Sequence, residues 1–309
     1  MPGIPGRIRT RAALAELLPG ALASEPFALT DLFARELDEY AEMIVGPGRR
    51  LAGFMTRGED ATFTERARLT LEKLGMPTEA VAHHQALADW FEHKRAFLKL
   101  EWHATGEGTN AKLAPLAACY FRRRPTVDEL LERMVRWGHG AALRELVMDV
   151  SRLLEKDTIH FVSAAFKPQS DVHHKLYFSQ WVTSESRGKV ADRIARLFHH
   201  YGFPVETEEL WQHHHARMLP AEPDTTLFVS ISFNREGVAP SFKIDYPGVA
   251  PARAAVWVPE TEQVLVMEDA ERACALAGTK ALSFLGVRLS LDSPVPALKY
   301  YADVPDRAE

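Results

Sequence analysis

One arrangement recurs from about residue 97 to the C-terminus and constrains the fold more than any other feature. Two strand-like segments are followed by an amphipathic helix, first as FLKLEWHAT, LAACYFRRR and a helix that begins at Thr126 with Glu129 completing a capping box. The second copy is TIHFVSAAF, HKLYFSQWV and a helix that stops at Gly202. A less clear third copy is TLFVSISF, SFKIDY and EDAERACALAG, and the pair ALSFLGVRLSL and PALKYYADV closes the chain. The sequence therefore predicts an α+β protein built from ββα repeats over residues 95–305.

The N-terminal third follows this pattern only in outline. Apolar spacing predicts helices over residues 28–44, 64–74 and 79–92, and RLAGFMTR is interpreted as a strand of a degenerate first unit. No linker rich in Gly, Ser or Pro separates this part, so we expect one domain over residues 1–309, mainly helical up to about residue 90.

Composition excludes several classes of protein. A net charge of −5, with Lys and Arg spread along the chain, argues against a nucleic-acid groove. The apolar runs are far shorter than the ~20 residues that cross a bilayer, and the N-terminal segment lacks the apolar core of a secretory signal. Two cysteines, Cys119 and Cys274, are too few for a disulfide framework. We expect a cytoplasmic protein, by default a monomer, with no membrane or nucleic-acid partner.

The strands alternate between an apolar and a polar face with period 2. In HKLYFS, for example, Lys175 and Tyr177 share one face and Leu176 and Phe178 the other. A cation separated by one residue from a Tyr recurs in three hairpins. The polar faces of the other strands carry Lys99, Glu101 and His103; Tyr120 and Arg122; Lys243 and Asp245; Arg288; and Lys299, Tyr301 and Asp303.

Two folds are compatible with this alternation. An open antiparallel sheet would place the cations in solvent, where they need no explanation. A closed antiparallel β-barrel ringed by α-helices would turn the polar face into a solvated lumen, and eight to ten strands would leave room for a ligand. The repeated pairing of cation and Tyr favours closure. Several cations enclosed together cost several kcal/mol each unless an anion compensates them, so closure predicts an anionic ligand.

The ββα repeat, HKLYFSQW followed by a helix, and the terminal FLGVRLSL and ALKYYADV resemble the ABBA-type aromatic prenyltransferases, whose fold is called the PT barrel. The resemblance covers roughly residues 95–305. It implies an enzyme that transfers an isoprenyl group from an allylic diphosphate to an aromatic acceptor such as an indole, a phenol or an aromatic peptide side chain.

The resemblance also implies roles for individual residues. It implies that the diphosphate is bound by Arg122, Lys175, Lys243, Arg288 and Lys299, and that the allylic carbocation is shielded by Tyr120, Tyr177 and Tyr301. It further implies that Glu101 binds or deprotonates the acceptor. These roles agree with the chemistry, because cations stabilise a departing diphosphate, aromatic faces attract a carbocation, and a carboxylate accepts a proton.

No DDxxD or similar acidic cluster is present, so we expect no required cofactor and metal-independent turnover. Asp245 and Asp303 also face inward, which leaves one Mg²⁺ as an open alternative. The HHH run at residues 213–215 and the pairs His83–His84 and His199–His200 are interpreted as solvated or partly buried residues. GEGTN at residues 106–110 is interpreted as a hairpin turn.

Two other functional classes stay open at this point. A non-catalytic barrel that binds an anionic lipid or an aromatic metabolite would have the same lumen. A relative with changed chemistry could act on a peptide side chain. The sequence does not identify the acceptor, because acceptor pockets differ in shape rather than in motif.

Overall fold

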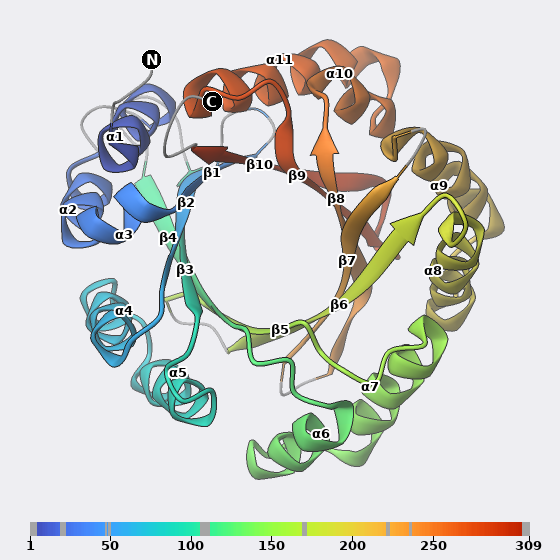
Figure 1. Ribbon diagram of the computed structural model, residues 1–309, viewed down its shortest axis with the longest axis horizontal. Helices are drawn as coiled ribbons and strands as arrows, with labels where there is room; N and C mark the ends of the chain where they lie inside the picture. Colours follow the sequence, from blue (N-terminus) through green and yellow to red (C-terminus); the bar gives the residue numbers. More distant parts are fainter. Residues whose placement is uncertain are drawn as a thin grey trace.

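A computed structural model describes residues 5–18, 23–46, 48, 51–105, 112–168, 172–220, 223–234 and 237–304. Within these residues ten antiparallel strands form a closed barrel in the order β1-β10-β9-β8-β7-β6-β5-β4-β3-β2 (Figure 1). The strands are β1 Ala41–Val45, β2 Leu51–Gly58, β3 Ala96–Thr105, β4 Lys112–Phe121, β5 Phe161–Phe166, β6 His173–Thr183, β7 Asp224–Phe233, β8 Val238–Val249, β9 Leu282–Ser290 and β10 Ser293–Val304. The prediction of a closed barrel is confirmed, and the open sheet is excluded.

The helices form a ring around the barrel (Figure 1). They are α1 Gly6–Leu17, α2 Ser24–Leu32, α3 Ala34–Glu39, α4 Ala61–Lys73, α5 Thr78–Trp90, α6 Val127–Arg136, α7 Ala141–Leu154, α8 Arg187–Tyr201, α9 Val205–Met218, α10 Pro251–Ala254 and α11 Glu260–Ala277, with a 3₁₀ turn at Ala255–Trp257. Local signals set several ends: Thr126 and Glu129 form the predicted capping box of α6, and Gly202 ends α8 at φ 74°.

The repeating unit differs from the prediction in one respect. Two helices, rather than one, follow each of the first four strand pairs, and α7 and α9 were missed. The predicted helix over residues 28–44 is also wrong in its last part, because Ala41–Val45 forms β1 and closes the barrel by pairing with both β2 and β10. The predicted strand RLAGFMTR is β2, and the helices over 64–74 and 79–92 match α4 and α5.

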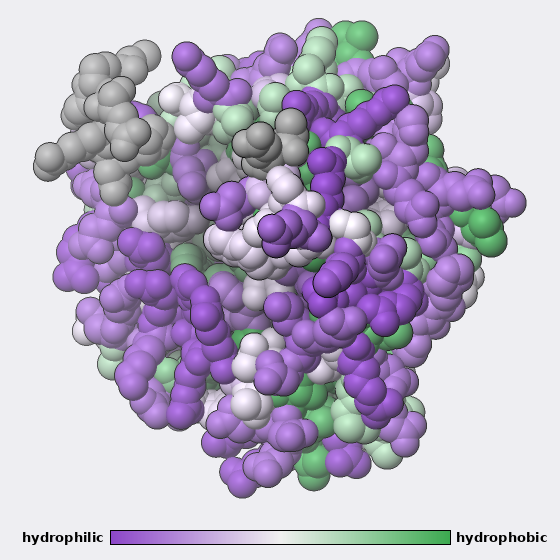
Figure 2. All heavy atoms as spheres, turned by 45° about the vertical axis from the view of Figure 1, so that its right-hand side comes forward, coloured by the Kyte–Doolittle hydropathy of each residue, from purple (hydrophilic) through white to green (hydrophobic). Residues whose placement is uncertain are grey.

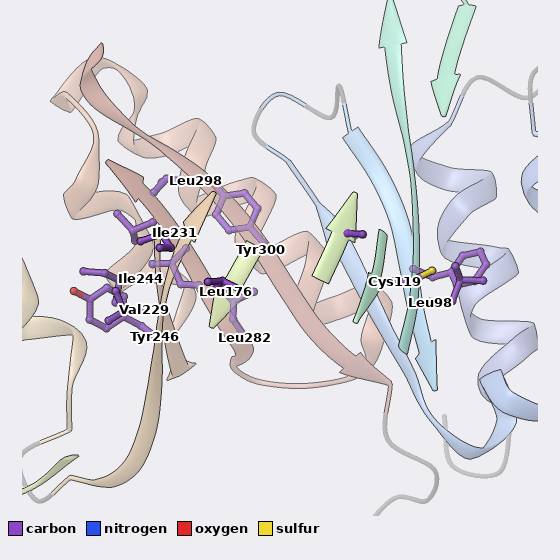
Figure 3. Close-up of a cluster of buried hydrophobic side chains, with 14 of the residues drawn as sticks. Leu98, Cys119, Leu176, Val229, Ile231, Ile244, Tyr246, Leu282, Leu298 and Tyr300 are labelled. Carbon is purple, nitrogen blue, oxygen red and sulfur yellow. The ribbon is translucent and has the colours of Figure 1, made fainter. Parts of the chain in front are cut away.

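The hydrophobic core lies between the outer face of the barrel and the helices. Side chains from the apolar strand faces, such as Leu98, Cys119, Leu176 and Ile244, are fully or almost fully buried there (Figure 3). Because neighbouring residues of a strand point to opposite faces, burying this set outward directs the polar set into the lumen. The alternation that the sequence shows is therefore the reason that the cations face inward.

Figure 2 shows one face on which hydrophilic side chains predominate and hydrophobic ones are scattered. No helix in the described part of the chain combines the length and hydropathy of a membrane-spanning segment.

His84, His214 and His215 are more buried than predicted, whereas His83 is partly buried and His199 and His200 are exposed, as predicted. Of the run at residues 213–215, only His213 is exposed, and the Nδ1 atom of His215 lies 2.9 Å from the Tyr246 hydroxyl. His84 is also buried, so the solvated interpretation is wrong for these positions. Aromatic packing between the helices and the barrel explains them better than metal binding does. The predicted turn at residues 106–110 lies outside the described residues.

Candidate active site

A cavity of about 470 Å³ occupies one end of the barrel lumen. Most of its wall is aromatic and its polar groups are few. The lining residues are Tyr40, Glu42, Met55, Phe97, Tyr120, Arg122, Arg124, His160, Phe161, Tyr177, Trp181, Thr226, Phe228, Lys243, Asp245, Phe284 and Tyr301. A cavity of this size with an apolar wall and a few convergent charges is typical of a site for a small molecule.

The three predicted shield tyrosines meet in this cavity. The ring centroids of Tyr120 on β4 and Tyr177 on β6 are 5.7 Å apart. The ammonium nitrogen of Lys243 lies 5.6 Å from the Tyr177 ring centroid and 5.3 Å from that of Tyr301. Tyr177 and Tyr301, far apart in the sequence, thus flank one cation, and an electron-rich wall of this kind attracts positive charge.

Glu101 lies at the centre of a buried cluster rather than at the cavity wall. Its carboxylate is fully buried and lies 3.0 Å from Lys99 Nζ and 2.9 Å from Lys299 Nζ. Burial alone would raise the pKa of Glu101, but the two ammonium groups outweigh it and hold the pKa far below its usual range. Glu101 is therefore ionised and is a weak base while both lysines stay in place. Its assignment as the proton acceptor stays a prediction.

The lysines carry more positive charge than their partners balance. Lys243 forms an ion pair with Asp245 at 2.7 Å, and the Glu101 carboxylate forms ion pairs with both Lys99 and Lys299. The expectation of unpaired cations is thus wrong for these three lysines, because inward carboxylates partly neutralise them. Burial and the positive charge of Lys99 lower the pKa of Lys299, whereas Glu101 raises it. The lowering effects are larger, and the pKa of Lys299 falls to about 8.

Lys175 differs from the other three lysines. Among the described residues its ammonium group makes no hydrogen bond or ion pair. Burial, followed by Lys99, Lys243 and Lys299, lowers the pKa of Lys175 well below its usual value. The hydroxyls of Ser163 and Ser230, on the strands beside β6, are buried without a hydrogen-bond partner. The Lys175 ammonium group and these two hydroxyls thus lack hydrogen-bond partners in the same region. A bound anion would accept hydrogen bonds from all of them.

The remaining two predicted diphosphate ligands do not join the lysines. We call Lys99, Lys175, Lys243 and Lys299 the lysine cluster. Arg122 lines the cavity at the end opposite to the lysine cluster, with its guanidinium carbon 5.8 Å from the Phe161 ring centroid. Arg288 is exposed and donates hydrogen bonds to Ser241 Oγ at 3.0 and 3.2 Å. Alternation predicts the face of a residue but not its height along the barrel axis, and height separates these arginines from Lys175.

No family model and no curated protein matches the sequence. Solved structures match over nearly the whole chain. The 6-dimethylallyltryptophan synthase of Micromonospora olivasterospora is 13% identical, with a TM-score of 0.65 and 99% of each chain covered. The 5-dimethylallyltryptophan synthase of Streptomyces coelicolor is 14% identical, with a TM-score of 0.62 and coverage of 97% and 94%. The NotF prenyltransferase is 12% identical, with a TM-score of 0.62 and coverage of 96% and 93%.

The chain has the PT-barrel fold. This likeness confirms the predicted resemblance at the level of architecture. At 12–14% identity it shows the fold alone, so the chemistry must be argued from the residues of this barrel.

One acidic residue of this PT barrel, Glu42, was missed by the sequence analysis, which placed only its neighbour Asp303 on an inward face. Glu42 on β1 faces Asp303 on β10, is almost fully buried, and accepts a hydrogen bond from Ser283 Oγ at 2.6 Å. Burial, then the neighbouring Asp303 charge, raises the pKa of Glu42 well above its usual value, and burial raises that of Asp303. Glu42 escaped notice because its segment was assigned to a helix, where strand alternation does not apply.

Glu42→Gln is expected to stabilise the protein at neutral pH. A raised folded-state pKa means that wild type loses stability as pH rises from the unfolded value of about 4.3 toward the folded value. The amide carries no charge and can still accept from Ser283, so the variant avoids this loss. We expect a gain of about 1 kcal/mol or more at pH 8 and little gain at pH 4, measured by chemical denaturation.

Glu39→Gln, an exposed change at the end of α3, is the matched control and is expected to show no such pH-dependent gain. A destabilised Glu42→Gln at pH 8 would contradict the raised pKa.

No group of His, Cys, Asp and Glu in the described ranges has an arrangement that could hold a metal ion. The inward carboxylates each face a lysine or another carboxyl group instead: Glu101 and Asp245 are bound to lysines, and Asp303 lies beside Glu42.

Proposed function

We propose that this PT barrel is an aromatic prenyltransferase, which transfers an isoprenyl group from an allylic diphosphate to an aromatic acceptor. The observation that carries the proposal is the convergence of Lys99, Lys175, Lys243 and Lys299 in an enclosed lumen behind three tyrosines. Structural neighbours support it, since the S. coelicolor and M. olivasterospora enzymes were solved with DMASPP and Trp, and NotF with brevianamide F and DMSPP.

We assign the diphosphate to the lysine cluster. Lys175 and the hydroxyls of Ser163 and Ser230 offer unused hydrogen-bonding capacity, and Lys243 and Lys299 lie close enough to Lys175 to lower its pKa. When the bond between the allylic carbon and the diphosphate oxygen breaks, both electrons leave with pyrophosphate. Preorganised ammonium groups stabilise that charge at no cost of reorganisation. Arg288 lies outside this cluster, where it donates hydrogen bonds to Ser241.

The tyrosines surround the allylic cation. Tyr177 and Tyr301 already present their rings to Lys243 and Tyr120 presents its ring to Lys99, so the same faces can stabilise a carbocation above the diphosphate. Burial raises the pKa of all three phenols, so they stay neutral. Gly286 helps to keep this space open, because a Cβ there would lie 3.0 Å from Asp245 Oδ1 and 3.3 Å from the Tyr301 ring.

The acceptor ring completes the reaction. A ring carbon attacks the cation, a carbon–carbon bond forms, and the ring regains aromaticity by losing the proton from that carbon. We propose Glu101 as the final proton acceptor. Once pyrophosphate has drawn Lys99 and Lys299 toward itself, the pKa of Glu101 rises and the carboxylate becomes a better base.

Incubation with dimethylallyl, geranyl and farnesyl diphosphate against indoles, phenols and aromatic peptides, followed by mass spectrometry, tests the function. A product with the mass of one added prenyl group is expected for at least one pair. If the diphosphates bind and no pair gives product, the protein is a binding module and the proposed activity is wrong.

Turnover is expected to persist in excess EDTA. The lysine cluster supplies the positive charge that Mg²⁺ provides in enzymes that bind diphosphate through carboxylates. The rate of product formation with and without EDTA measures this. Complete loss of activity, restored by Mg²⁺, would contradict it and would point to Asp245 and Asp303 as ligands.

A further inference from the structure

One member of the lysine cluster has no counter-ion in the free protein. The other three form ion pairs of 2.7–3.0 Å with inward carboxylates: Lys99 and Lys299 with Glu101, and Lys243 with Asp245. The terminal nitrogen of Lys175 makes no hydrogen bond or ion pair among the described residues. Two carboxylates are thus shared by three lysines, and none is left for the fourth.

The two strands beside β6 bring hydroxyl groups, rather than carboxylates, to Lys175. Its cross-strand partners are Ser163 on β5 and Ser232 on β7. Ser230 lies two residues before Ser232 and therefore on the same face of β7. The hydroxyls of Ser163 and Ser230 are buried without a hydrogen-bond partner. These serines offer hydrogen bonds to a ligand, but none of them can balance a positive charge on Lys175.

The neighbours of Lys175 on its own strand add no negative charge either. By alternation, His173 and Tyr177 share the inward face of β6 with it. Burial raises the pKa of Tyr177, so the phenol is neutral, and a histidine is either neutral or cationic. At this level of the barrel, no described residue of β5, β6 or β7 supplies the missing charge.

Positive charge faces Lys175 across the lumen. Burial is the largest cause that lowers the pKa of Lys175 well below its usual value. The charges of the other three lysines lower it further, and only Glu101 opposes them. A neutral amine costs much less in such a place than an unpaired ammonium group does. Lys175 is partly rather than fully buried, so a proton can enter and leave through the lumen.

We propose that the donor diphosphate binds together with a proton: Lys175 is a neutral amine in the free protein and becomes an ammonium group when the diphosphate binds. The proposal rests on the proposed function and makes its donor site sensitive to pH. The diphosphate supplies the counter-ion that Lys175 lacks, and the amine takes one proton from solvent. When pyrophosphate leaves after transfer, the amine returns that proton to solvent.

Calorimetric titration with inorganic pyrophosphate, in buffers of different ionisation enthalpy at about pH 8, counts the protons that are taken up. Wild type is expected to take up about one proton more than Lys175→Met or Lys175→Arg, because methionine has no titrating group and arginine never releases its proton. Lys299, with a pKa of about 8, and pyrophosphate also exchange protons, but they do so in all three proteins. Methionine removes the charge and arginine keeps it, so agreement between the variants excludes an indirect effect through Lys299.

The affinity for pyrophosphate is expected to follow the proton. Since one proton accompanies each anion, wild-type affinity should fall by up to about 10-fold more per pH unit than that of Lys175→Arg as the pH rises above neutrality. Lys189→Met, an exposed change on α8, is the control and should match wild type in proton uptake and in this slope. Should either Lys175 variant fail to fold, Lys175→Gln, which also lacks a titrating group, replaces it.

Chemical denaturation tests the state of Lys175 without any ligand. In the unfolded chain a lysine has a pKa of about 10.4, so the unfolded protein binds the proton that folded Lys175 has released, and wild-type stability rises with pH toward that value. Any gain in denaturation midpoint of Lys175→Met over wild type is therefore expected to shrink between about pH 7 and pH 10. A difference that is constant over this range would show that Lys175 is an ordinary ammonium group and would overturn the proposal.

Equal proton uptake by wild type and both Lys175 variants would also overturn it. The proposed function fails separately. If wild type takes up the extra proton with pyrophosphate and no donor gives product, the coupling holds and the prenyltransferase function is wrong. If products form and all three proteins take up the same number of protons, the function holds and the coupling is wrong.

Discussion

Lys175→Met is expected to weaken pyrophosphate binding about 10- to 100-fold, the effect of losing a charge-assisted hydrogen bond, and to stabilise the free protein by about 1 kcal/mol. Both effects have the same cause. Lys175 lies among three other lysines with no partner among the described residues, so its charge is costly until an anion arrives. Methionine keeps the length of the side chain and removes the charge.

Calorimetric titration with pyrophosphate and chemical denaturation of the free protein measure the two effects. Lys189→Met changes an exposed lysine on α8 and is expected to alter neither. Unchanged pyrophosphate affinity in Lys175→Met would remove Lys175 from the proposed donor site. A large loss of stability in Lys175→Met would contradict the expectation that the charge of Lys175 destabilises the free protein.

Glu101→Gln is expected to destabilise the free protein by about 3–5 kcal/mol, the cost of leaving buried charges without a counter-ion. Lys99 and Lys299 both depend on this carboxylate at 2.9–3.0 Å. Pyrophosphate supplies the missing negative charge, so we expect it to raise the melting temperature of Glu101→Gln by more than that of wild type. Thermal unfolding with and without pyrophosphate measures the difference.

The same variant tests the chemistry. At saturating pyrophosphate, where the fold is restored, Glu101→Gln is expected to bind donor and acceptor and to transfer the prenyl group slowly. Glu65→Gln, which breaks an exposed pair with Arg68, is the control and should behave as wild type. A fully active Glu101→Gln would remove Glu101 as the proton acceptor and would leave Glu42 and Asp245, which line the cavity, as the candidates for that role.

Strand alternation explains why much of the site could be predicted. Lys175, Tyr177, Lys243, Lys299 and Tyr301 were placed on inward faces, and each points into the lumen. Alternation depends only on the backbone of a single strand and on which face is apolar, and both can be read locally. The strand pairs, the capping box at Thr126 and the helix end at Gly202 were local signals of the same kind.

Features that depend on two distant segments were missed. Glu42 was assigned to a helix because β1 is short and is held in place by β10, nearly 260 residues later. The partners of Glu101 come from β3 and β10, so the sequence could not show that two lysines would hold its pKa low. Arg122 was grouped with Lys175 because both face inward, although their heights in the barrel differ.

The sequence by itself determined which side chains face inward, since period-2 alternation and the apolar faces that the helices cover leave no other choice for a closed barrel. Only the tertiary structure decided how those side chains are divided: lysines with two carboxylates at depth, tyrosines above them, and Arg122 toward the mouth of the cavity. The physical reason is that strand register and tilt fix the height of each residue along the barrel axis, and both are set by pairing between strands far apart in the chain.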